Sequence, residues 1–184
     1  EIAEEDTLQK RSVLGMDILV NINIAPTVKM GVNLSVDGKN RIDLQGGGEL
    51  AYTMNTLGDS RFTGRYNLTG GFVRYNPPII SEKLFKIQDG SYVSWNGDIA
   101  DPQMSITAVE TVRTTISEEE KNTRQVNFDI SIIIKNSLEN LSVSFDLSAP
   151  EDLTLQNQLT SLTAEQRASQ AMSLLIYNTS VSYT

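Results

Sequence analysis

Apolar and polar residues alternate along most of this chain, so that every second side chain is apolar. This period of two is typical of a β-strand with one face on a core and the other in water. The alternation predicts about nine strands, with no helical segment between them. The apolar positions of these strands span 16–24, 28–36, 42–54, 62–72, 85–87, 93–95, 104–108, 126–134 and 141–147. Pro26 is predicted to interrupt the strand pattern between the first two, because proline donates no ladder hydrogen bond.

Only the C-terminal part changes period. Thr163 and Gln166 match a capping box, in which each side chain bonds the other residue's backbone N–H. Apolar residues then recur on one helical face. We therefore expect an amphipathic helix over roughly 163–177, after an irregular or helical stretch from Pro150 to Leu162.

Strands with one apolar face each must cover one another when no helices lie between them. A closed barrel, a two-sheet sandwich, and a long sheet folded over on itself all satisfy this requirement. The inward set is aliphatic with few aromatic residues, and the strands are polar on the other face, as in a sheet with water on one side.

Composition narrows the possible functions. The 184 residues carry a net charge of -8 with no basic cluster beyond Lys10-Arg11, so nucleic acid is not an expected partner and contact with lipid would come through apolar area. The absence of cysteine and histidine removes disulfides, the common nucleophilic triads and zinc sites with those ligands. No stretch approaches the roughly 20 apolar residues that span a bilayer.

Three features are the remaining candidates for chemistry, and a structural role explains each of them better. Asp98 and Asp101 could form a carboxylate pair or bind a hard cation, yet Asp, Asn, Gly and Pro also form the elbow between two strands. The acidic run 118–120 sits in a predicted polar loop over 117–123, and the glycines at 46–48 lack the lysine and helix of a phosphate-binding loop. We therefore expect no catalytic residue, no metal site and no cofactor.

For two features, the sequence is compatible with either a structural role or a role in recognition. Trp95 shares the register of Val93, which favours a place in a core or groove over an exposed recognition site. The terminal helix is interpreted as a plug that caps the sheet, with a partner-binding helix as the alternative.

The order of several segments resembles that in the C-terminal domain of the TamB translocation and assembly module. These segments are 64–71 (GRYNLTGG), 85–87 (FKI), 90–95 (GSYVSW), 97–98 (GD), 101–108 (DPQMSITA), 138–145 (LENLSVSF) and 172–175 (MSLL). The resemblance covers roughly residues 16–178. Members of this family usually continue past the Leu-Leu helix into a short tail, whereas this sequence stops soon after Tyr177.

The resemblance implies an all-β fold, a long curled β-sheet that forms a taco-like trough with an apolar interior, with a C-terminal amphipathic helix. It also implies a periplasmic part of a protein anchored in the inner membrane, with an outer-membrane barrel of the TamA/BamA type as partner. The family is implicated in phospholipid transport to the outer membrane and in the assembly of outer-membrane proteins.

We divide the chain into a polar lead-in (1–15), a β-sheet trough (16–149) and a helical plug with its tail (150–184). The expected function is non-enzymatic, with an apolar groove for phospholipid acyl chains. A chaperone-like module that pairs with nascent outer-membrane β-strands is the alternative. The residues expected to line the groove are Val20, Ile22, Val32, Leu34, Val93, Trp95, Met104, Ile106, Phe128, Ile130, Ile132, Val143 and Phe145.

Overall fold

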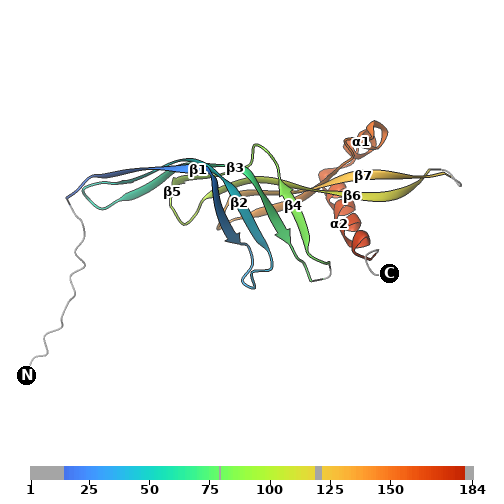
Figure 1. Cartoon of the computed structure of the whole chain (residues 1–184), viewed down its shortest axis with the longest axis horizontal. Helices are drawn as coiled ribbons and strands as arrows, with labels where there is room; N and C mark the ends of the chain where they lie inside the picture. Colours follow the sequence, from blue (N-terminus) through green and yellow to red (C-terminus); the bar gives the residue numbers. More distant parts are fainter. Residues whose placement is uncertain (1–14, 79, 119–121, 181–184) are drawn as a thin grey trace, which may run out of the picture.

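Eight strands in one antiparallel sheet, followed by two helices, make up the computed structural model, which describes residues 15–78, 80–118 and 122–180 (Figure 1). The strands are β1 (Ile18–Asn33), β2 (Arg41–Met54), β3 (Ser60–Tyr75), β4 (Lys83–Ile87), β5 (Tyr92–Gly97), β6 (Gln103–Glu118), β7 (Asn122–Ser137) and β8 (Ser142–Ser148). The helices are α1 (Leu153–Thr160) and α2 (Ala164–Ser180). The predicted all-β fold with a curled sheet and a C-terminal helix is confirmed.

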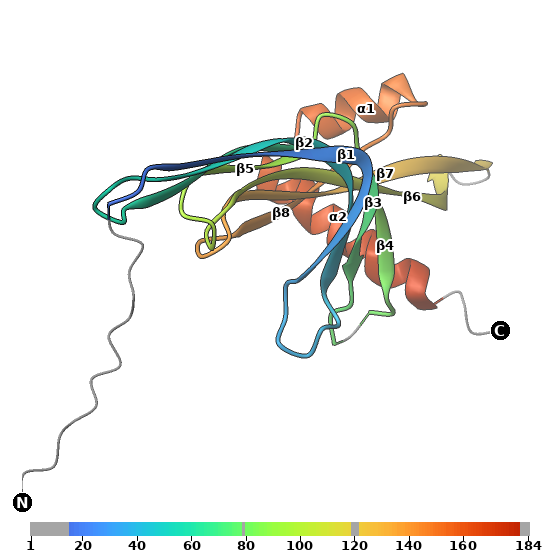
Figure 2. The same ribbon diagram turned by 60° about the vertical axis from the view of Figure 1, so that its left-hand side comes forward.

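The strands lie in the order β1-β2-β3-β4-β6-β7-β8, and β5 also pairs with both β3 and β6. Strands β4 and β5 thus share one position in the sheet, each covering a different part of β3. The sheet curls, and the turned view in Figure 2 shows that the strands at its two ends run in different directions.

The prediction that Pro26 interrupts the strand pattern is wrong, and for this reason eight strands form instead of about nine. Strand β1 continues through Pro26, and its register with β2 shifts between Ile24 and Val28. Because β1 is an edge strand and the shift is a bulge, proline costs no ladder hydrogen bond at this position. The strand bends sharply along its length (Figure 2).

Glycines in β2 allow the backbones of its neighbours to come close at this bend. A Cβ atom on Gly46 would lie 2.1 Å from the carbonyl oxygen of Asn67, and one on Gly48 would lie 1.9 Å from that of Arg65. The Tyr66 hydroxyl reaches over β2 and donates a 2.7 Å hydrogen bond to the carbonyl of Val28. The glycine run therefore serves close backbone packing and ties β1 to β3.

The C-terminal segment caps one part of the sheet. The predicted capping box is confirmed, since the Thr163 N–H donates to Gln166 Oε1 at 2.9 Å and the Gln166 N–H donates to Thr163 Oγ1 at 3.2 Å. Helix α2 contacts β8 and β6, and it buries Ala171 and Leu175 in the core. A second helix, α1, forms within the stretch interpreted as irregular or helical.

The predicted polar loop between β6 and β7 is shorter than the sequence indicated. Ser117 pairs with Thr123, so both residues belong to the strands. The strands continue because their threonine-rich ends favour extended backbone. Glu119 and Glu120 lie outside the described residues.

At the break between β4 and β5, the Ser91 side chain takes the place of strand pairing with β6. This residue is buried, and its Oγ accepts a 3.1 Å hydrogen bond from the Thr107 N–H of β6. Its carbonyl accepts a 3.0 Å bond from the Leu68 N–H of β3. A single serine thus connects β3 to β6 across the break.

Ser91→Ala is expected to lower the free energy of unfolding by about 1 to 3 kcal/mol, because it leaves the Thr107 N–H without its acceptor in a buried place. Urea unfolding followed by circular dichroism measures the loss. Ser144→Ala, at an exposed position on β8, is the matched control and should change little. Equal losses in the two variants would show that Ser91 does not bridge the break.

Candidate functional site

The apolar residues of the strands share one face of the sheet, which we call the inner face. Ile22, Leu50, Gly64 and Trp95 stand opposite one another in β1, β2, β3 and β5. Ala108 and Ile132 belong to a corresponding row across β6 and β7. The alternation along each strand therefore places one continuous set of apolar side chains on this face.

All thirteen residues expected to line the groove lie on strands or beside them, and they differ in exposure. Six are buried, namely Val93, Met104, Ile106, Phe128, Ile130 and Ile132. Four are half-buried, namely Val32, Leu34, Trp95 and Phe145. Three are exposed, namely Val20, Ile22 and Val143.

The inner face is closed where β4 faces β8. The Phe145 ring of β8 lies 5.3 Å from the Tyr75 ring and 6.4 Å from the Phe85 ring, measured between centroids. Phe85 is 0% exposed. We call the inner face of β4, β6, β7 and β8 the closed part, because its side chains pack against one another and against α2.

The inner face of β1 remains open to solvent. Four of its apolar side chains, which we call the open part, are exposed by 36% to 43%, namely Val20, Ile22, Val28 and Met30. Their neighbours on β2 and β3, such as Leu50 and Phe62, are buried. The open part is therefore an apolar strip that runs along an edge strand and continues into a buried floor.

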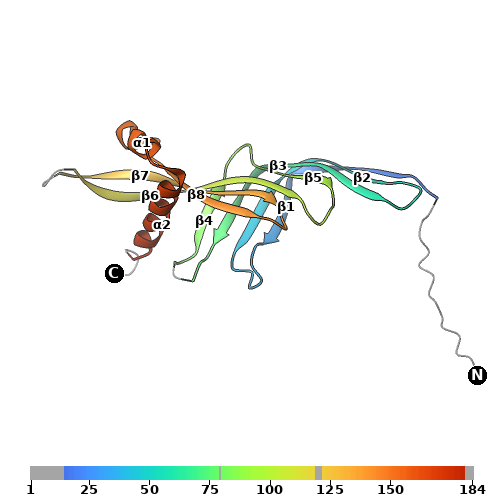
Figure 3. The same ribbon diagram turned by 180° about the vertical axis from the view of Figure 1, so that it is seen from behind.

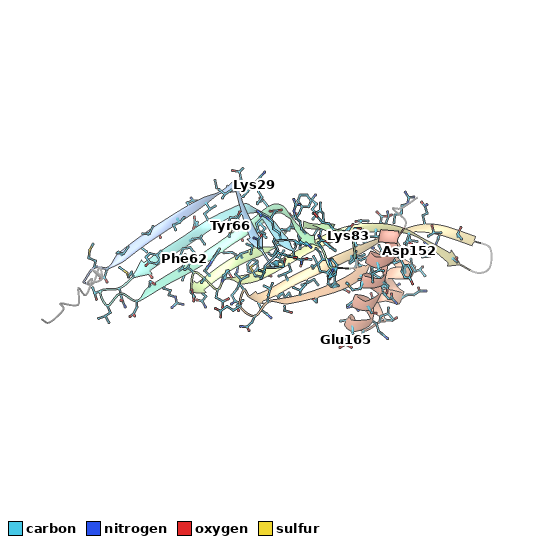
Figure 4. All side chains as sticks on the ribbon, turned by 90° about the horizontal axis from the view of Figure 1, so that it is seen from below. Lys29, Phe62, Tyr66, Lys83, Asp152 and Glu165 are labelled. Atoms are coloured by element: carbon cyan, nitrogen blue, oxygen red, sulfur yellow. The ribbon has the colours of Figure 1, made fainter. Side chains whose placement is uncertain are left out.

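Trp95 lies on the floor beside this strip. Its ring meets the Phe62 ring edge to face at a centroid distance of 5.4 Å, and its Nε1–H donates a 3.1 Å hydrogen bond to the Ile99 carbonyl. Figure 4 shows Phe62 and Tyr66 on the half of the sheet away from the helices. Trp95 is therefore half-buried on the inner face of the sheet.

A polar hollow adjoins the end of the apolar strip. It has a volume of about 680 Å³ and is lined by Asp17, Ile18, Thr53, Met54, Asn55, Asp59, Ser60, Arg61, Asn96 and Gly97. Ile18 and Met54 form the inner-face row next to Val20, whereas Thr53, Arg61 and Asn96 lie on the outer face by their register, so the hollow wraps around the end of the sheet. The Arg61 guanidinium donates a 2.8 Å hydrogen bond to Asn96 Oδ1 at its rim.

One charged pair on the inner face escaped the sequence analysis. Lys83 Nζ lies 3.9 Å from Glu110 Oε1, and Glu110 Oε2 is buried with no hydrogen-bond partner among the described residues. Burial raises the pKa of Glu110, and the Lys83 charge opposes that rise. The available signal was register, since Glu110 continues the inward series of Ile106 and Ala108. In Figure 4, Lys83 lies near the helices.

The carboxylates Asp98 and Asp101 serve the backbone of loops. Asp98 Oδ1 accepts a 2.8 Å hydrogen bond from the Ala100 N–H, and Asp101 Oδ1 accepts a 3.0 Å bond from the Glu139 N–H. Both carboxylates therefore fit the elbow interpretation. The described residues contain no group of three metal-ligating side chains.

The fold and its apolar inner face define a curled β-sheet module. The chain belongs to the TamB family, because the model of the TamB C-terminal domain matches residues 2–184. This family is a non-enzymatic part of the translocation and assembly module, works with TamA-type outer-membrane partners, and is periplasmic or spans the envelope. Comparisons with curated proteins and with solved structures gave no match. None of the described helices has the length and apolarity needed to cross a membrane.

Proposed function

We propose that the open part of the inner face holds the acyl chains of a phospholipid during transport to the outer membrane. The observation that carries this proposal is the exposed strip of Val20, Ile22, Val28 and Met30 beside a buried apolar floor. Such contiguous apolar surface on a soluble protein marks a binding site. The protein would act in the periplasm beside an outer-membrane barrel of the TamA/BamA type.

The polar hollow at the end of the strip suits the other end of the same molecule. Acyl chains would lie on the strip, and the headgroup would reach around the end of the sheet to the hollow, where the Arg61 guanidinium would bind the phosphate beside Asp17 and Asp59. An apolar strip that ends at a polar hollow matches the two-part chemistry of a phospholipid. The buried lining residues of the closed part would then serve as the support of the strip, and not as contact surface.

Trp95 provides the test, because it is the single tryptophan of the chain. Phospholipids brominated on their acyl chains should quench its fluorescence when they bind to the inner face. Ile22→Asp should weaken this quenching about fivefold, since a carboxylate on the strip must be desolvated by the acyl chain. A titration with brominated lipid measures the change.

Asn21→Asp is the control, because it adds the same charge one residue away on the opposite face of β1. It should leave the quenching unchanged. Equal quenching curves for Ile22→Asp and Asn21→Asp would contradict the proposal. Quenching that appears only when the chain unfolds would also contradict it.

A further inference from the structure

The second half of β1, the ends of β2 and β3 beside it, and β4 form a short arm that turns away from the long axis of the molecule (Figure 1, Figure 3). The arm begins at the register shifts of β1 and β2. It comprises residues 28–33, 41–45, 70–75 and 83–87. Its inner side carries core residues such as Ile42 and Phe85, so a partner could reach the arm on its outer side.

Lys86 stands on the outer side of this arm among apolar side chains. Phe72 of β3 lies opposite it on one side, and Val109 of β6 lies opposite it on the other. Leu84 precedes it by two residues on the same face of β4. Phe72 and Leu84 are each 47% exposed, and Lys86 forms no ion pair with any described residue. Exposed apolar side chains around an unpaired lysine indicate a contact surface, because the outer face of such a sheet is usually polar.

Two arginines are held in place beside this group. Arg74 lies opposite Leu84 across the strands, and Arg41 lies opposite Arg74. Asp43 accepts a 2.7 Å hydrogen bond from Arg41 Nε and a 3.0 Å bond from Arg74 Nε. The shared carboxylate therefore orients both guanidinium groups on the outer side of the arm.

A hollow of about 460 Å³ adjoins Phe72 on the side toward β1. Lys29 and Arg41 are among its lining residues, with Asp43 beside them. Figure 4 shows Lys29 at the margin of the sheet. Lys29 forms no ion pair with any described residue, so its ammonium group is available to an anion that enters the hollow.

The fold gathers positive charge here that the sequence does not show as a cluster. Four cations come from four different strands, namely Lys29, Arg41, Arg74 and Lys86. Two carboxylates accompany them, Asp43 and Glu82, so four minus two leaves about +2 on this side of the arm. The whole chain has a net charge of -8. An anionic surface would therefore be attracted to this side and repelled by the rest of the molecule, which fixes the orientation of binding.

We propose that the outer side of the short arm docks on the surface of a bilayer that contains anionic phospholipid. Phe72 and Leu84 would enter the interfacial layer, and the cations between them would contact headgroup phosphates. A protein partner fits less well, because cations separate the exposed apolar side chains and no continuous apolar centre of a protein interface results. This docking goes beyond the proposed function and requires no lipid on the inner face.

Sedimentation with vesicles tests this surface in the full chain. The vesicles contain phosphatidylcholine and phosphatidylglycerol in a ratio of about seven to three, and vesicles of phosphatidylcholine alone are the comparison. The protein should bind the anionic vesicles more tightly, and added salt should weaken this binding. Lys86→Glu should lower the affinity about tenfold, since it reverses one charge at the surface. Phe72→Ala should lower it about fivefold, through the loss of inserted apolar area.

Lys135→Glu is the matched control for the charge reversal. Lys135 is an exposed lysine on the same face of the sheet, yet its neighbours across the strands are Ser105 and Ser142. Leu19→Ala is the control for the truncation, because Leu19 is 66% exposed on β1 outside the arm. Both controls should bind the anionic vesicles as the unchanged chain does.

Three outcomes would overturn the proposal. The first is an equal loss of vesicle binding in Lys86→Glu and Lys135→Glu, and the second is unchanged binding in both Lys86→Glu and Phe72→Ala. The third is binding of poly-glutamate as tight as that of the anionic vesicles, since an acidic polymer would then suffice. Quenching of Trp95 by a short-chain brominated lipid, presented as monomers, should persist in both arm variants. Lost docking with preserved quenching separates this surface from the lipid site on the inner face.

Discussion

Gly48→Ala is expected to destabilise the protein by about 4 kcal/mol, a loss in the range of severe backbone clashes. The new Cβ atom would lie 1.9 Å from the Arg65 carbonyl oxygen and 3.0 Å from its carbonyl carbon. Both atoms belong to the backbone of β3, so no side chain can rotate away. The β2–β3 ladder would have to separate at the bend. Urea unfolding monitored by circular dichroism gives the change in the free energy of unfolding.

Gly70→Ala is the matched control for this experiment. A Cβ atom on Gly70 meets nothing within 4 Å, and the residue lies on β3 close to the same bend. We expect a change within about 0.5 kcal/mol. Similar losses at the two positions would show that general backbone flexibility, and not close approach at Gly48, explains the glycines.

Phe85→Ala should lower the free energy of unfolding by about 3 to 5 kcal/mol, as is usual for a fully buried ring. The ring is 0% exposed and lies 6.4 Å from the Phe145 ring across the inner face. Its loss would leave a cavity between β4 and β8. Denaturant unfolding, read from both backbone circular dichroism and Trp95 fluorescence, measures the effect.

Leu84→Ala tests the opposite face of the same strand. Leu84 is 47% exposed, so truncation there should cost less than about 1 kcal/mol. A loss at Phe85 as small as that at Leu84 would show that the closed part is open in solution and accessible to ligand.

Alternation predicted the parts of the fold that depend on local pattern. Ile130, Ile132 and Ile134 are all buried on the inner face, as their period of two indicates. Pro26 misled the prediction, because proline forbids a ladder hydrogen bond only where the N–H faces a partner strand. Pro26 lies at a bulge on an edge strand, where no ladder hydrogen bond is required of its backbone nitrogen. Which strand lies at the edge depends on the whole sheet and cannot be predicted from local pattern.

The division of the inner face into open and closed parts could not come from the sequence. Val20 and Ile130 both lie on the inner face of their strands, yet Val20 is 43% exposed and Ile130 is 0% exposed. The difference depends on how the sheet curls and where α2 packs. The ion pair of Glu110 with Lys83 could not be predicted for a related reason, because it depends on which strand lies beside β6 in the folded sheet.

The break between β4 and β5 has a mechanical consequence. Strands β1 to β3 and strands β6 to β8 each form long ladders, whereas β4 and β5 join β6 through short ladders and Ser91. A pulling force that separates β3 from β6 would load these few bonds first. Under tension, the sheet should therefore separate first at this joint, while the ladders of β1 to β3 and of β6 to β8 stay intact.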